Sequence, residues 1–134
     1  MIFREIIKLE TKGPMDKIIL TKQIVDIVKE CGIKEGVCNI YCPATTAGFI
    51  ANENEAMLVS DMSTLLKKLA PENKLYQHPS NGYAHLRTLF ARQDLNIPFS
   101  GGKLILGTWQ DIMFWEFDTH GRKRKVIITV VGDC

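Results

Sequence analysis

The sequence lacks a strong net charge and has no long hydrophobic run. Seventeen Lys and Arg residues against fifteen Asp and Glu leave a formal charge of +2. A charge this small does not favour a nucleic-acid or membrane partner, so we expect neither, and any bound anion must be held locally. No apolar stretch approaches the roughly 20 residues that span a bilayer, and Arg4, Glu5 and Lys8 leave no room for a secretory signal. We therefore expect a cytoplasmic protein.

The sequence also lacks a cysteine spacing that would indicate a zinc site or a disulfide framework. The four cysteines are Cys31, Cys38, Cys42 and Cys134, with no C-x2-C pair among them. A chain of 134 residues with 46% hydrophobic content can bury roughly two-thirds of its surface without covalent staples. We expect reduced thiols and a single domain over residues 1–134.

Hydrophobic periodicity predicts an α+β fold. One helix is capped by Thr21 and stops at Gly32, a second runs from residues 52–54 to Pro71, and a short third one covers 83–90. A loop without periodicity fills 71–82. Antiparallel strands dominate the last third of the chain, with helices packed on one face of the sheet. The predicted strands cover residues 2–10, 37–42, 49–51, 95–99, 103–106, 112–117 and 125–131, and a short apolar run lies at 18–20.

Candidate functional residues gather in three groups at the ends of these elements: residues 45–46 with 52–54, residues 78–85 and residues 107–110. Thr45 and Thr46 bring two hydroxyl groups beside small residues, a pattern that suits a phosphate or carboxylate but also a simple turn. Asn52 and Glu53 begin the second helix, so they are either a cap or a ligand-binding pair. Thr108, Trp109 and Gln110 follow Gly107 between two apolar strands, where we expect a bulge that either turns Trp109 and Gln110 toward a pocket or simply packs the Trp.

Two histidines flank an Asn81-Gly82 turn. His78 and His85 are seven residues apart, so both imidazoles can converge on one point. With a carboxylate such as Glu53 they would form a zinc or magnesium site with an open position, or serve in proton transfer. The alternative is a pair of solvent-facing loop histidines.

A basic run, residues 122–125, follows a turn that carries His120. We interpret this run as a solvated edge strand rather than a nucleic-acid contact, because no aromatic platform accompanies it. His120 is expected to be exposed.

Taken together, several segments resemble the YjbQ family, whose members are also called secondary thiamine-phosphate synthases. The resemblance covers nearly the whole chain, in order. It rests on residues 44–48 (ATTAG), 52–54 (NEN), 81–86 (NGYAHL), 101–110 (GGKLILGTWQ) and 116–118 (EFD).

The resemblance implies an α/β sandwich with a mixed, largely antiparallel curved sheet, a homotrimer, and an active site where subunits meet. From their residue types and positions, we expect His85, His78 and Glu53 to be catalytic, in metal ligation or proton transfer. Ligand-binding roles fall on Thr45, Thr46, Asn52, Asn81, Gly82, Thr108, Trp109 and Gln110.

One position departs from the family pattern, which has a histidine where this chain has Ala44. Two functions follow as alternatives. The first is an enzyme of the transferase type that makes thiamine phosphate, which binds a phosphorylated or otherwise anionic molecule, with a divalent metal held by His78 and His85. The second is a non-catalytic ligand-binding or assembly protein that has lost that histidine.

Overall fold

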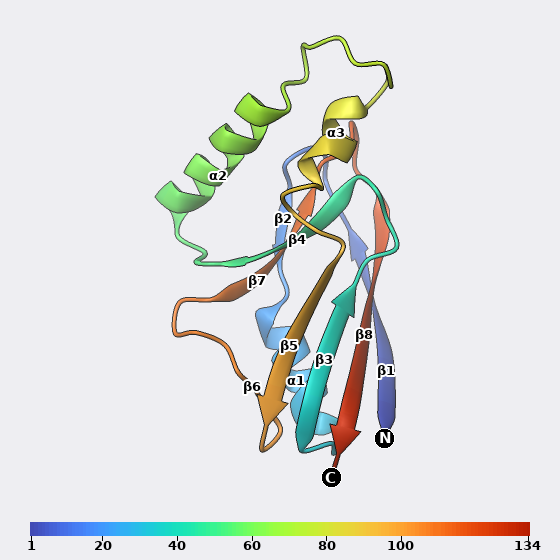
Figure 1. The fold of residues 1–134 in the computed structure, drawn as a ribbon, viewed down its shortest axis with the longest axis vertical. Coiled ribbons are helices and arrows are strands. Elements are labelled where there is room, and N and C mark those ends of the chain that lie inside the picture. Colours follow the sequence, from blue (N-terminus) through green and yellow to red (C-terminus); the bar gives the residue numbers. More distant parts are fainter.

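Two antiparallel sheets and three helices make up the computed structural model, which describes residues 1–134 (Figure 1). No helix is long and apolar enough to cross a membrane. The strands are β1 (Ile2–Glu10), β2 (Lys17–Ile19), β3 (Glu35–Tyr41), β4 (Ala47–Asn52), β5 (Asp94–Ser100), β6 (Lys103–Leu104), β7 (Asp111–Glu116) and β8 (Lys123–Asp133). The helices are α1 (Thr21–Glu30), α2 (Ala56–Leu69) and α3 (Gly82–Arg87).

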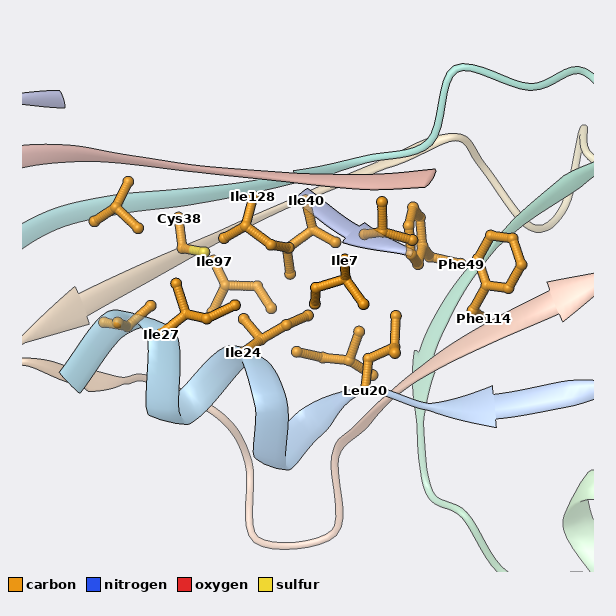
Figure 2. Close-up of a cluster of buried hydrophobic side chains, with 14 of the residues drawn as sticks. Ile7, Leu20, Ile24, Ile27, Cys38, Ile40, Phe49, Ile97, Phe114 and Ile128 are labelled. Carbon is orange, nitrogen blue, oxygen red and sulfur yellow. The ribbon is translucent and has the colours of Figure 1, made fainter. Parts of the chain in front are cut away.

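The larger sheet has the strand order β1-β8-β3-β5-β6. Alternation along its strands sends one set of side chains inward, and the register places Ile7 opposite Val126 and Ile40 opposite Ile128. These four side chains are buried against α1 and the smaller sheet (Figure 2). The sheet's other face is open to solvent and carries Ile2, Ile6, Val37 and Val131, each at least 43% exposed.

The smaller sheet, β2-β7-β4, is buried on both faces. Ile112 and Phe114 of β7 point into the main core beneath the larger sheet. Phe114 packs edge-on against Phe49, with 5.4 Å between the two ring centroids. Met113 and Trp115 point the opposite way, into a second core with α2 and α3. A strand with apolar residues on both faces therefore finds cover for both within one chain.

Helix ends differ in detail from the sequence-based expectations. Thr21 does not cap α1; its hydroxyl donates to Asp111 (2.5 Å) and accepts the N–H of Ile112, which ties the helix to β7. The cap of α2 is Glu55, not residues 52–54, because its carboxylate accepts the N–H groups of the first helical turn. Glu53 therefore lies before the helix.

The expected α+β fold is confirmed, with three corrections. Every strand pairing is antiparallel, so the sheet is not mixed. The helices do not share one face: α1 covers the larger sheet, whereas α2 and α3 cover the smaller one. The basic run pairs with β1 alone, because the pairing of β8 with β3 begins only at Ile127, and Lys123 and Lys125 are exposed as in a solvated edge strand; Arg124, however, is buried.

Candidate functional site

A polar hollow of about 520 Å³ opens where β3 ends and the chain turns into β4. Loop 43–46 forms one wall, the start of α3 a second, and the turn between β7 and β8 a third. We call it the polar hollow; its lining residues are Tyr41, Pro43, Ala44, Thr45, Thr46, Asn81, His85, Asp118, Arg122 and Arg124.

A buried ion pair lies beneath this hollow. Arg124 contacts Glu116 through Nη2–Oε2 (2.5 Å) and Nε–Oε1 (2.8 Å), and Glu116 is fully buried. Thr11 donates a further hydrogen bond to Glu116. Burial alone would lower the pKa of Arg124, but the hydrogen bond and charge of Glu116 outweigh it and raise that pKa. Arg124 also donates to Thr46 Oγ1 at 2.9 Å, which holds the hydroxyl at the floor of the hollow.

Asp118 links the floor to the walls. Burial opposes its ionisation, but hydrogen bonds from the Thr119 N–H, Asn81 and Thr46, together with the charge of Arg122, hold its pKa below the usual value. The Arg122 contact is a 2.5 Å Nη1–Oδ2 bond. Asp118 is therefore an anion that fixes three neighbouring side chains in place.

Several donors of the polar hollow have no partner within the chain. The backbone N–H groups of Thr45 and Thr46 donate to no acceptor of the protein. Arg122 uses only Nη1 for Asp118, so its Nε and Nη2 groups are free, and its side chain is 42% exposed. Two adjacent amides and a half-exposed guanidinium form a set of donors that suits an anion.

A second hollow, of about 310 Å³, adjoins the first through His85, which lines both. We call it the histidine hollow, and its walls are Tyr76, Gln77, His78, Gly82, His85 and Leu86. The imidazoles of His78 and His85 meet edge-to-face with their centroids 4.9 Å apart. The sequence-based prediction that these two rings converge is confirmed.

A third hollow lies where β4 ends, beside the turn before β7, and has a volume of about 460 Å³. We call it the tryptophan hollow. Trp109 is 73% exposed here, and Gln110 accepts a hydrogen bond from the Gly107 N–H, which closes a turn rather than the expected bulge. The residues that line it are Ala51, Asn52, Glu53, Gly107, Thr108, Trp109 and Gln110.

The predicted site residues therefore fall into two groups. Thr45, Thr46, Asn81 and His85 line the polar hollow, with His78 and Gly82 next to it. Asn52, Glu53, Thr108, Trp109 and Gln110 line the separate tryptophan hollow. Glu53 and the histidines do not share a hollow, and no group of three His, Cys, Asp or Glu side chains could hold a metal ion. The predicted zinc or magnesium site is thus incomplete in one chain.

Sequence reasoning missed the charged residues that build the polar hollow, namely Glu116, Asp118, Arg122 and Arg124. The run of basic residues predicts a solvated strand. Alternation along β8, however, places the Arg124 side chain on the inner face of the sheet, as it does that of Val126. The sequence did contain a signal for this pair. When strand alternation points a charged side chain into the protein, that side chain needs a buried partner of opposite charge. Glu116, on the strand before it, is that partner.

The thiols are free, and two are buried. Burial raises the pKa of Cys38 to about 12 and that of Cys42 to about 11. Cys42 lies close enough to Arg124 and Glu116 for their charges to act on it in opposite directions. Both are inert packing residues at neutral pH.

The protein is thus a small α+β domain that carries a polar hollow above a buried Arg–Glu pair. The model of the family described as "UPF0047 protein YjbQ-like" matches residues 5–133, and the chain belongs to this family.

Relatives and solved structures agree with this assignment. A UPF0047 protein of Archaeoglobus fulgidus is 37% identical over 90% of this chain and 94% of its own length. The UPF0047 protein YugU of Bacillus subtilis is 34% identical over 94% of this chain and 97% of its own. A YbjQ-like protein of Sulfolobus solfataricus P2 superposes with a TM-score of 0.95 at 30% identity, covering 99% of each chain.

Proposed function

We propose that this protein binds a small phosphorylated or otherwise anionic molecule in the polar hollow. The observation that carries the proposal is the set of unpartnered donors, the Thr45 and Thr46 amides and the free N–H groups of Arg122. The Glu116–Arg124 pair and Asp118 hold this set rigidly, so little freedom is lost on binding. Hydrogen bonds to a charged group are each worth about 1.5–3 kcal/mol.

His85 is the group that we propose for proton transfer, because it lies in the wall of the polar hollow and on a helix. His78 contacts it, and Glu53 would act only if another chain brought the tryptophan hollow close. The activity that we propose is transfer of the thiamine-phosphate synthase type: the ring nitrogen of a thiazole phosphate bonds to the methylene carbon of a pyrimidine diphosphate, the bond between that carbon and the diphosphate oxygen breaks, and pyrophosphate leaves with a proton from His85. Both reactants carry the kind of anion that the polar hollow suits.

Calorimetric titration with inorganic phosphate tests binding. Arg122→Gln should weaken it roughly 10- to 100-fold, which corresponds to one lost charged hydrogen bond. Arg92→Gln is the matched control, since Arg92 is an exposed arginine paired with Asp94 outside the hollow. Equal affinities for the wild type and Arg122→Gln would contradict the proposal.

Two substitutions separate binding from catalysis at His85. His85→Ala should abolish ligand binding and leave the free energy of unfolding within about 1 kcal/mol, because the imidazole is partly exposed. His85→Asn keeps a hydrogen bond but cannot titrate near neutral pH, so it should bind ligand without turnover. Variants that unfold readily yet still bind ligand would instead make His85 a structural residue.

The second candidate function is binding or assembly without catalysis. Ala44 favours it, because a methyl group occupies the wall of the polar hollow where the family pattern has an imidazole. Phosphate binding without any thiamine-phosphate formation would select this alternative over the enzyme.

A divalent ion does not fit the residues of one chain. His78 and His85 would offer two nitrogen ligands, whereas protein zinc sites use three or four. We therefore assign no step of the reaction to a metal, and a zinc or magnesium ion belongs to the proposal only if another subunit completes its ligands.

We also propose that the protein assembles as a homotrimer. The support is the open face of the larger sheet, where Ile2, Ile6, Val37 and Val131 are exposed on three adjacent strands. The apolar residues of β7 do not add to this argument, because both of its faces are covered within the chain. Light scattering that gives the mass of one 15.2 kDa chain would contradict the trimer.

A further inference from the structure

Two adjoining hollows of opposite character share one residue. The polar hollow has charged and hydrogen-bonding walls, whereas the surface of the histidine hollow is mostly carbon, from Tyr76, Leu86 and the imidazole faces. His85 lines both, so a molecule bound in one hollow would pass His85 to reach the other.

The histidine hollow is held in shape by contacts that do not involve a ligand. The Tyr76 hydroxyl donates to the carbonyl of Pro71 at 2.7 Å, which fixes the ring. The ring also packs on Gly82, where an added Cβ would lie 2.9 Å from Tyr76 Cβ. Gly82 and its neighbours Tyr83 and Ala84 are buried. This hollow is therefore a formed feature of the chain, although it opens to solvent.

The size and walls of the histidine hollow limit what it can hold. Its volume of about 310 Å³ lies at the lower end of the range for small-molecule sites, which suits one ring rather than a nucleotide. Aromatic and aliphatic walls attract a flat apolar group, and a second charged group would lose its hydration there without a partner.

We infer that the ligand is a phosphoester, or a similar anion, of a single apolar ring, with the anion in the polar hollow and the ring in the histidine hollow. This inference rests on the proposed anion binding. His85 then lies beside the oxygen that joins the two parts, and the histidine hollow supplies the discrimination against free phosphate.

Calorimetric titration with two probes, inorganic phosphate and phenyl phosphate, tests the inference. Burial of a phenyl ring contributes about 1.5–3 kcal/mol, so phenyl phosphate should bind at least tenfold more tightly than phosphate. Leu86→Ala should weaken phenyl phosphate several-fold and leave phosphate unchanged. The matched control is Leu89→Ala, which removes a leucine just beyond α3 that is 70% exposed and lies outside the hollow.

The outcomes separate this inference from the proposed function. If phosphate binds but phenyl phosphate binds no more tightly, or if Leu86→Ala weakens both probes equally, the ring does not occupy the histidine hollow. If neither probe binds, the proposed function itself is wrong. Arg122→Gln should weaken both probes by the same factor, and an effect on phenyl phosphate alone would also overturn the assignment of the two hollows.

Discussion

The polar hollow and the tryptophan hollow are built in opposite ways. Beneath the polar hollow, Glu116 and Arg124 are buried and bonded to each other, and Arg124 holds Thr46 in place. The tryptophan hollow depends on a local turn, in which Gln110 bonds to Gly107, and on a Trp109 that is mostly exposed. The floor of the polar hollow is part of the protein interior, whereas the tryptophan hollow is a surface feature at the end of a strand.

The difference shows that polar side chains grouped in sequence need not have the same role. Burying the charges of Glu116 and Arg124 costs free energy, but their hydrogen bonds hold several elements in position. A site that binds an anion needs such fixed positions. An exposed aromatic residue on a turn costs little and is free to meet another surface. Four predictions test this contrast, in order of decreasing effect.

The largest effect is expected from Glu116→Gln, which leaves the Arg124 guanidinium buried without a charged partner. Breaking a buried ion pair costs about 3–5 kcal/mol, so urea unfolding should show a loss of that size. The control is Glu53→Gln in the tryptophan hollow, which should change the free energy of unfolding by no more than about 0.5 kcal/mol. Similar losses in the two variants would remove the distinction between the hollows.

The second prediction concerns pH. The pKa of Asp118 is lowered in the folded state, so its stabilising contribution is fully present above the unfolded value of about 3.9 and disappears as pH falls through the lower folded value. The wild type should therefore lose stability below about pH 4 more steeply than Asp118→Asn. Urea titrations between pH 2 and 7 measure the free energy of unfolding that this prediction concerns. Asp61 is exposed, so Asp61→Asn is the control, and its loss of stability at acid pH should match that of the wild type.

The third prediction concerns zinc. Ala44 lines the polar hollow with His85, so Ala44→His would add a third imidazole near the His78–His85 pair. Three nitrogen ligands with an open position form a common zinc site, and competition with a coloured chelator should show tighter zinc binding. Lys103→His places a histidine at the far hairpin of the larger sheet and should have no effect. Unchanged zinc affinity in Ala44→His would show that this position does not face the histidines.

The smallest effect is expected from Trp109→Ala. Because Trp109 is 73% exposed, its loss should change the free energy of unfolding by no more than about 0.5 kcal/mol. The fluorescence that remains comes from Trp115, which is fully buried, so the emission should shift to the blue. A loss above 2 kcal/mol would mean that the tryptophan hollow is structural after all.

Much of the fold was predictable because short-range patterns define it. Strand β1 coincides with the predicted residues 2–10, and the end of α1 is marked by Gly32, whose positive φ of 85° suits glycine. The hairpin at Gly101-Gly102 has both residues at positive φ, as a glycine pair predicts. The grouping of the candidate site residues was not predictable, since chemistry alone placed Glu53 with the two histidines, and the fold puts them in different hollows.

The sequence by itself determined the positions of the helices and strands, the α+β class and the family, because periodicity, turn residues and motifs are local. Only the tertiary structure decided which loops share a hollow and which charges are buried. Thr11 and Glu116 are 105 residues apart, and Thr46 and Arg124 are 78 apart, yet each pair forms a hydrogen bond. Such contacts depend on the registers of β1, β7 and β8, and register arises from packing the two sheets around the one core that they share.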